Sequence, residues 1–143
     1  MADDSAVCSC IVDCAGLHEI ASVKSNNLKQ LFFDRLSSGV IAVPAIVLKE
    51  FRELYEEEAE VLEPYIAKKI VMKREYHAGA ARIADSLNSG FSRGPYDGET
   101  DLYTASIASL EGYVVLTSAS QAGYYDGMDC EVSDVMSWVE QQG

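Results

Sequence analysis

The sequence predicts an α/β protein of three layers, in which helices cover both faces of a central, mostly parallel sheet of four to five strands. Short apolar runs alternate along the chain with longer segments whose apolar residues recur three and four positions apart. These periods are typical of buried strands and amphipathic helices. The first run, residues 7–13, is almost continuously apolar, as expected for a strand covered on both faces. Strands that alternate with helices favour parallel pairing through right-handed crossovers.

Glycine and proline set the element boundaries in the first half of the chain. The second helix is expected to end at Gly39, since glycine readily adopts the left-handed conformation that follows many helices. Pro44 ends the second strand, because it lacks the N–H that a central strand donates, and it can open the next helix. Glu50 then falls in the first turns of that helix. In this half of the chain we expect strands at residues 7–13 and 40–43, and helices at residues 14–25, 26–39 and 45–62.

The second half of the chain repeats this alternation with shorter strands. An amphipathic helix is expected to end at Gly90, and a turn-rich loop with Gly94, Pro95 and Gly98 separates it from an alanine-rich helix starting near Thr100. Strands are expected at residues 68–73, 113–120 and 130–134, helices at 77–90, 100–112 and 135–142, and a loop or short helix at 121–129.

The composition is that of an ordinary globular protein, and we expect one domain over residues 1–143. Apolar residues make up 48% of the 143 residues and charged residues 24%, which is enough for a substantial core. The acidic start, MADDSA, differs from a secretory signal, and no window approaches the ~20 apolar residues of a membrane span. We therefore expect a cytoplasmic protein without a membrane segment. Cys8, Cys10 and Cys14 crowd into one apolar run, where reduced, buried thiols are the simplest interpretation.

The net charge of −12 argues against simple electrostatic attraction to nucleic acid. Basic residues are nevertheless clustered in two places, and a basic patch there stays an alternative to the solvated helix edges that we favour. A strongly acidic chain also suits a basic protein partner. The two clusters are Lys68, Lys69, Lys73 and Arg74, and Lys24, Lys29 and Arg35.

Acidic residues from three separate segments are predicted to meet at one edge of the sheet. Asp13 ends the first strand, Glu50 follows the second, and Glu99 and Asp101 start the helix before the fourth. Ligands of parallel sheets bind beyond the carboxyl ends of the strands. Buried like charges repel, so such a group favours a bound divalent cation. Oxygen ligands suit Mg²⁺ or Mn²⁺, and neither of the two histidines is near this edge in sequence. Such ions activate water for phosphodiester hydrolysis.

Each acid also has a simpler interpretation by itself. Asp13 can cap the helix that follows it, because Asp is frequent between a strand and a helix. Glu50 lies among many other glutamates, as solvated helix residues do. Asp101 can complement the helix dipole. The joint placement of these residues, and not any one of them, supports a metal site.

These segments resemble a known family. IVDCAGL, VPAIVLKEFRE and GETDLYTASIASLEGYVVLTSAS resemble the three motif regions of PIN-domain ribonucleases, especially the bacterial toxins of toxin–antitoxin pairs. The resemblance runs from about residue 8 to about residue 120. It implies a PIN-like fold, an endoribonuclease that hydrolyses RNA with Mg²⁺ or Mn²⁺, a basic antitoxin partner and a homodimer. Dimerisation has local support only from aromatic residues on or beside helices, and core packing explains most of them as well as exposure does. They are Phe32, Phe33, Tyr55 and Tyr65.

The resemblance also implies roles for single residues. Asp13, Glu50 and Asp101 match the acids that bind the metal and position the attacking water, and Glu99 belongs to the third motif. The family commonly has a fourth acid after the last core strand, in a Thr-x-Asp arrangement. Thr117 and Ser118 match the first part of that arrangement as auxiliary residues, but Ala119 stands where the acid is expected.

Ala119 leaves two functional classes open. A nuclease with three acids can still hold one ion, although loss of a ligand or of a water-positioning group costs several kcal/mol in the transition state. Asp126 or Asp129 from the next loop is a candidate replacement. The alternative is a catalytically degenerate PIN-like module that binds RNA or protein. A haloacid-dehalogenase-type phosphatase needs an acid where this chain has Ala15, and a receiver domain needs an acidic pair and a lysine that are not visible.

Overall fold

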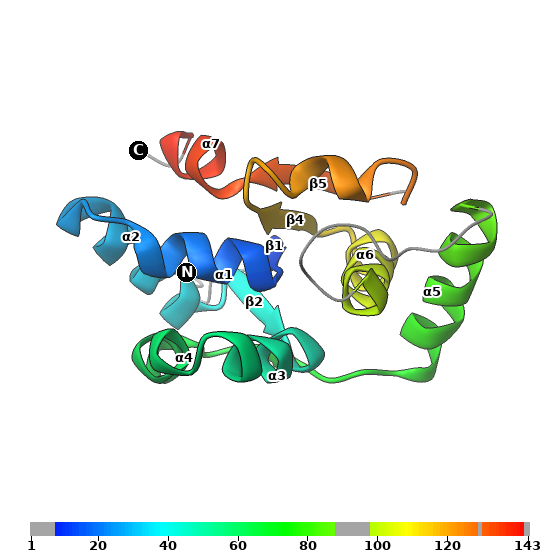
Figure 1. The fold of residues 1–143 in the computed structure, drawn as a ribbon, viewed down its shortest axis with the longest axis horizontal. Helices are drawn as coiled ribbons and strands as arrows, with labels where there is room; N and C mark the ends of the chain where they lie inside the picture. Colours follow the sequence, from blue (N-terminus) through cyan, green and yellow to red (C-terminus); the bar gives the residue numbers. More distant parts are fainter. Residues whose placement is uncertain (1–7, 88–97, 129, 142–143) are drawn as a thin grey trace, which may run out of the picture.

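Five strands form one sheet in the computed structural model, which describes residues 8–87, 98–128 and 130–141. The order is β3-β2-β1-β4-β5, and each neighbouring pair is parallel. The predicted α/β class with a largely parallel sheet is therefore confirmed (Figure 1). The strands are β1 Cys10–Val12, β2 Ile41–Pro44, β3 Lys69–Ile70, β4 Val114–Thr117 and β5 Glu131–Asp134.

Helices form a layer on each face of the sheet (Figure 1). One layer consists of α1 Cys14–Ser22, α2 Asn26–Ser38, α3 Ala45–Leu54, α4 Glu56–Leu62 and α7 Val135–Glu140. The other consists of α5 Arg74–Leu87, α6 Gly98–Glu111 and the short 3₁₀ helix η2 Ala122–Tyr125. A second 3₁₀ helix, η1 Glu63–Tyr65, follows α4.

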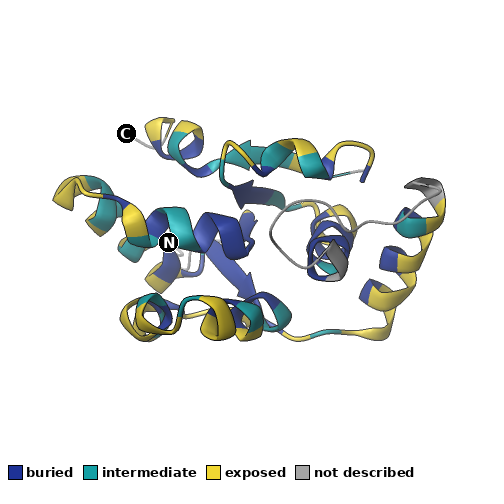
Figure 2. Cartoon of the chain, in the orientation of Figure 1, coloured by how far each residue is buried: buried dark blue, intermediate teal, exposed yellow. Residues whose placement is uncertain are grey.

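Alternate residues of the central strand supply two separate cores. Cys10 and Val12 of β1 pack with the α1 layer, whereas Ile11 packs with α5 and α6. All three are at most 2% exposed, and Figure 2 shows the buried strands between their helices. A strand enclosed on both faces needs no polar alternation, which is why its sequence is a continuous apolar run.

Three details differ from the sequence-based expectations. The helix predicted over residues 45–62 is two helices, because Tyr55 leaves the helical conformation at φ −137° and its ring stacks on His18. The three glutamates that follow open α4, where the helix dipole favours negative charge. Pro44 ends β2 and caps α3 as predicted, but it is itself the last residue of the strand, opposite Ile70, one residue beyond the predicted end. The exposure suggested for Phe32 is not found, because this residue is fully buried beside Trp138, which agrees with the alternative of core packing.

The thiols follow the prediction in part, because Cys8 is only half-buried. Cys8, Cys10, Cys14 and Cys130 are all free, and Cys10 and Cys14 are buried. Burial raises the pKa of both of these thiols. Among the described residues, no helix combines the length and the apolar character that crossing a membrane requires.

Candidate acid site at the carboxyl edge of the sheet

Asp13 lies at the end of β1, where it is 1% exposed and accepts three hydrogen bonds. Its backbone is extended, so the chain can turn directly into α1, and its Oδ1 caps that helix by accepting from the Gly16 N–H at 2.7 Å. Oδ2 accepts from the Thr117 hydroxyl at 2.7 Å and from the Tyr125 hydroxyl at 2.7 Å. The capping interpretation is therefore correct, but it accounts for only one oxygen of the carboxylate.

Gly16 allows α1 to lie directly against the end of β4. A Cβ at this position would be 2.5 Å from the Leu116 carbonyl oxygen and 2.6 Å from a Val12 methyl, so a side chain does not fit. The Asp13 N–H also donates to the Leu116 carbonyl at 3.1 Å. The ends of the two adjacent strands are thus joined by backbone contact as well as by the Asp13 carboxylate.

Asp101 is the second buried acid of the site, at 5% exposure. It extends from α6, and its Oδ1 lies 3.2 Å from the same Tyr125 hydroxyl that contacts Asp13. Its Oδ2 accepts from Gln121 Nε2 at 3.3 Å. Residues 13 and 101, which are far apart in sequence, are therefore linked through one phenol oxygen.

The two acids differ in how well their charged forms are stabilised. Burial, followed by the negative charge of Asp13 and then by that of Glu50, raises the pKa of Asp101 to about 7. Burial also raises the pKa of Asp13, but three short donors oppose that rise. The pKa of Tyr125 is raised further by its burial beside both acids, so the phenol keeps its proton. Its single hydrogen goes to Asp13 by the shorter contact, which makes Asp13 the acid best held as a carboxylate.

The structure also brings Glu50 to this end of the sheet. Glu50 is half-buried on α3, and its charge raises the pKa of both Asp101 and Cys14. Glu99 begins α6 two residues before Asp101, but its side chain lies outside the described residues. Three of the four predicted acids therefore influence one region of the molecule.

The last residue of β4 contacts an acid, whereas the serines that follow it bond to each other. Thr117 is fully buried and bonds to Asp13, whereas the Ser118 hydroxyl pairs with Ser120 at 3.2 Å. Ala119 is exposed in the turn. Of the two proposed replacements for its missing acid, Asp126 is exposed after η2 and Asp129 lies outside the described residues.

Sequence reasoning missed three residues of this region. Tyr125 and Gln121 contact the acids from η2 and from the residue before it. The only sequence signal was an unusual pair of tyrosines shortly after the fourth strand. His18 was placed away from this edge, yet it lines a cavity together with Ser118 and Gln121. These positions depend on how η2 folds back over the sheet, which local sequence pattern does not specify.

The donor chemistry of the site fits a hard cation, although its described residues are not arranged around one. Asp13, Glu50 and Asp101 offer oxygen ligands of the kind that Mg²⁺ and Mn²⁺ prefer. Their mutual repulsion, visible in the raised pKa of Asp101, is what a cation relieves. Within the described residues, however, no three His, Cys, Asp or Glu side chains are placed to hold an ion together. The Tyr125 hydroxyl joins two of the acids instead.

Solved structures share this architecture. DNA-bound VapBC from Salmonella typhimurium superposes with a TM-score of 0.65 at 18% identity, covering 90% of this chain and 99% of the other. PAE2754 from Pyrobaculum aerophilum gives a TM-score of 0.64 at 14% identity, covering 94% and 96%. FitAcB from Neisseria gonorrhoeae gives 0.61 at 18% identity, covering 88% and 97%. The neighbours are PIN-domain toxins of toxin–antitoxin pairs.

The chain has a PIN-like fold. The similarity covers nearly all of it, as the three sequence motifs had implied. No family model matches the sequence, and no curated protein is similar to it. At identities below 20% the likeness establishes the PIN-like fold, and the activity has to be argued from the site itself.

Proposed function

We propose that this protein is a divalent-metal-dependent endoribonuclease that hydrolyses RNA phosphodiester bonds at the acid site. The observation that carries the proposal is the meeting of buried Asp13 and Asp101 on one hydroxyl, with the charge of Glu50 acting on Asp101. Folded proteins rarely bury acids together without a function, because each charge disfavours the other. Perturbed carboxyl groups at the carboxyl edge of a parallel sheet are typical of an active site.

Mg²⁺ or Mn²⁺ would be held by Asp13, Glu50 and Asp101, with Glu99 as a further acid near the start of α6. Such an ion polarises the phosphate and lowers the pKa of a bound water. The chain contributes rigidity. Thr117 and the Gly16 N–H hold the Asp13 carboxylate in one orientation, and Gln121 does the same for Asp101. Fixed donors and acceptors need no reorganisation during the reaction, which is a main source of catalysis.

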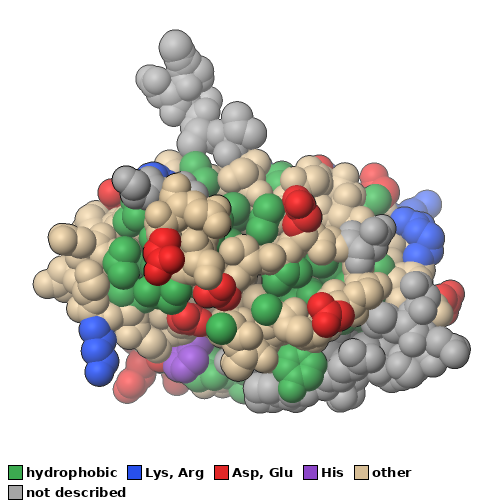
Figure 3. Space-filling model, turned by 90° about the horizontal axis from the view of Figure 1, so that it is seen from above, with side chains coloured by type: hydrophobic (Ala, Val, Ile, Leu, Met, Phe, Trp, Pro, Cys, Tyr) green, Lys and Arg blue, Asp and Glu red, His purple; other side chains and the backbone are tan. Residues whose placement is uncertain are grey.

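RNA binding by this protein cannot depend on a generally basic surface. The net charge is −12, and acidic side chains lie across the middle of the face in Figure 3 while basic ones lie towards its margins. Long-range repulsion of phosphates is the expected result. We therefore infer that affinity comes from the ion and from local contacts beside the acid site.

A basic antitoxin protein is the partner that we propose. Related folds were solved as complexes, namely FitAB bound to the IR36 DNA fragment and VapBC2 from Rickettsia felis bound to a promoter DNA fragment. The acidic surface of this chain complements a basic partner electrostatically. The free state of the described cysteines fits the reducing cytoplasm, where we expect the pair to act.

We also propose that the toxin-like chain forms a homodimer. Tyr65 is 40% exposed and its ring stacks on the half-buried Phe33 at 4.2 Å. This pair supports the proposal, whereas Phe32 belongs to the core and the half-buried Tyr55 stacks on His18. Sedimentation velocity at high protein concentration measures the state directly, with Tyr65→Ser as the surface variant. A monomer at all concentrations would remove the dimer from the proposal.

Cleavage of a mixed RNA pool with Mn²⁺ tests the proposed activity. We expect cleavage by the wild-type protein, its loss on chelation of the metal, and a fall of at least about 100-fold for Asp13→Asn, because a preorganised charge is removed. Asp85→Asn changes an exposed acid of α5 that has no proposed role in the site, and this variant should retain activity. If the wild type and Ala119→Asp both fail to cut RNA with either metal, the nuclease proposal is wrong.

Ala119 supports a second candidate, a PIN-like module that binds RNA or protein without catalysis. The position that usually carries an acid is an exposed alanine, and the Tyr125 hydroxyl contacts one carboxylate oxygen of each buried acid. The two candidates differ in metal affinity. A nuclease should bind Mn²⁺ through Asp13, so that Asp13→Asn weakens binding, whereas a binding module need not bind the ion at all.

A further inference from the structure

A cavity of about 380 Å³ lies beside the acid site and has no role in the proposed chemistry so far. It is open between α1 and the segment that follows β4. Its lining includes His18, Glu19, Ser118, Ser120, Gln121 and Tyr124. Cavities of this size hold small ligands, and this lining offers hydroxyls, an amide, a carboxylate and two rings.

Gln121 physically connects this cavity to the acids. Its side chain is 2% exposed and donates to Asp101 at 3.3 Å, and it also lines the cavity. Ser118 directly follows Thr117, which bonds to Asp13. A ligand in the cavity would therefore lie within one side chain of the acid site.

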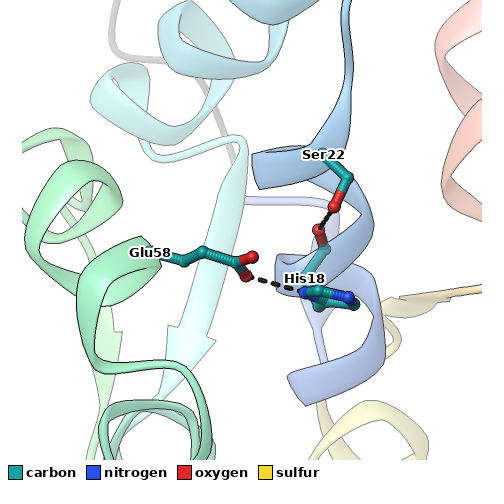
Figure 4. Close-up of polar contacts among 3 residues, drawn as sticks. All are labelled: His18, Ser22 and Glu58. Atoms are coloured by element: carbon teal, nitrogen blue, oxygen red, sulfur yellow. Dashed lines mark hydrogen bonds and ion pairs between the residues drawn. The ribbon is translucent and has the colours of Figure 1, made fainter.

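His18 forms a rigid wall of the cavity. Its Nδ1 donates to Glu58 Oε1 at 2.7 Å, and its ring stacks on Tyr55 with 4.1 Å between centroids and 12° between planes. Figure 4 shows the other ring nitrogen pointing away from Glu58. The Ser22 hydroxyl also bonds to the His18 carbonyl at 2.8 Å. The break between α3 and α4 places Tyr55 and Glu58 where they fix this ring.

Glu19 gives the cavity a hydrogen-bond acceptor. It is half-buried, and no Lys or Arg is among the residues that line this cavity. A phosphate would meet repulsion here, whereas the polar edge of a base, with its N–H donors, would be accepted. A second cavity of about 350 Å³ also contacts Glu19 and Ser22 and continues to Lys24, which is a suitable place for the next phosphate.

We propose that this cavity binds one unpaired nucleobase of the RNA next to the bond that is cleaved, and that it selects bases carrying an amino group. The proposal rests on the proposed nuclease function and names the substrate contact of that site. Tyr124 supplies a ring for stacking, as proteins that read single-stranded RNA commonly do. Glu19 accepts from the amino group of cytosine, adenine or guanine, whereas uracil carries no amino group and presents a carbonyl oxygen at the position equivalent to that of the cytosine amino group.

Binding of short RNA without metal tests the cavity apart from catalysis. Fluorescence anisotropy with chelator present would compare labelled hexamers of cytidine, adenosine and uridine. We expect cytidine and adenosine hexamers to bind about tenfold more tightly than the uridine hexamer, as one good base contact provides. Tyr124→Ala should weaken binding of all three about tenfold through lost stacking, while Tyr124→Phe keeps the ring and the affinity.

Glu19→Gln is the more specific test of base preference, because it removes the negative charge and preserves the size of the side chain. The amide offers a donor as well as an acceptor, so we expect the tenfold preference for cytidine over uridine to disappear and the ratio of the two Kd values to approach one. His77→Gln changes the other histidine, which packs on Tyr103 away from this cavity, and should leave the ratio unchanged. Thermal unfolding of each variant verifies that it is folded.

The outcomes separate this proposal from the nuclease proposal. If Mn²⁺-dependent cleavage is found but Tyr124→Ala and Glu19→Gln alter neither RNA affinity nor base preference, the cavity proposal is overturned and the nuclease stands. Base-selective binding that these variants abolish, in a protein that cuts no RNA, supports the cavity and removes the nuclease. Equal affinity of the wild-type protein for all three hexamers overturns base selection outright.

Discussion

Strands β1 and β4 are parallel neighbours that end at the same edge of the sheet, with Val12 opposite Leu116, yet their ends are built differently. The end of β1 is closed, because Asp13 is buried and accepts three hydrogen bonds. The end of β4 opens after Thr117 into an exposed turn that contains Ala119. Changes at the first end should therefore disturb the fold and the acids together. Substitutions in the turn after β4 should alter the acid site and leave the fold intact.

The largest effect is expected where the two strand ends touch. Gly16→Ala would place a methyl 2.5 Å from the Leu116 carbonyl oxygen, and backbone cannot move as freely as a side chain. We expect the free energy of unfolding to fall by about 3 kcal/mol, which is at the upper end of the usual cost of overpacking. Urea denaturation measures this. Gly123→Ala is the matched control, since a Cβ there meets nothing within 4 Å; equal stability of the two variants would contradict the close packing of α1 against β4.

The next effect concerns the pH dependence of stability. Burial raises the pKa of Asp101 to about 7, whereas the unfolded chain has the ordinary value near 4. Between these values the folded protein holds a proton that the unfolded chain has released, so stability falls as pH rises through this window. With chelator present, we expect Asp101→Asn to reduce that fall by on the order of 2 kcal/mol between about pH 4 and pH 8.

Chemical denaturation at several pH values tests this expectation about Asp101. Asp85→Asn removes an exposed acid from α5 and serves as the control for the loss of one carboxyl group. A pH slope for Asp101→Asn equal to that of the wild type would mean that the acid is ionised in the folded protein at neutral pH. The contact between Tyr125 and Asp101 would then need another explanation.

The sequence was sufficient to predict the closed end but not the open one. An apolar strand that ends in an acid before a helix specifies Asp13 locally, because the strand, the cap and the turn all depend on neighbouring residues. Asp101 is predicted almost as well, since its helix leads into the adjacent strand. The parallel register then brings both acids to one edge, which is a general property of such sheets.

Tyr125 shows what sequence patterns could not provide. Its contact with Asp13 spans 112 positions, and it belongs to a short 3₁₀ helix whose path over the sheet depends on tertiary packing. The same limit applies to the stacking of His18 on Tyr55, because a break between two helices was needed to place Tyr55. Phe32 illustrates the opposite case, in which periodicity alone did not distinguish a core face from an exposed one.

Tyr125→Phe removes the hydroxyl that contacts both Asp13 and Asp101. Without it Asp13 loses one of its three donors and Asp101 loses its contact with the hydroxyl. We expect the metal-free protein to lose about 1 kcal/mol of stability. A cation should then bind more tightly, by about fivefold, because it meets less competition for the same oxygens. Mn²⁺ titration calorimetry and thermal unfolding measure the two quantities. Tyr124→Phe is the control; weaker Mn²⁺ binding by Tyr125→Phe would instead make the hydroxyl a supporting ligand.

The smallest effect is expected at Ala119, where the open end lacks its acid. Ala119→Asp adds a carboxylate to an exposed turn, so the free energy of unfolding should change by less than about 0.5 kcal/mol. If this position faces the acid site as the Thr-x-Asp arrangement implies, Mn²⁺ affinity should rise about threefold, because another charged oxygen draws the ion. Ser120→Asp places the same charge one residue further along the turn. An equal rise in Mn²⁺ affinity for both variants would show a general electrostatic effect. A rise for Ala119→Asp alone would show that a carboxylate at position 119 can contact the ion.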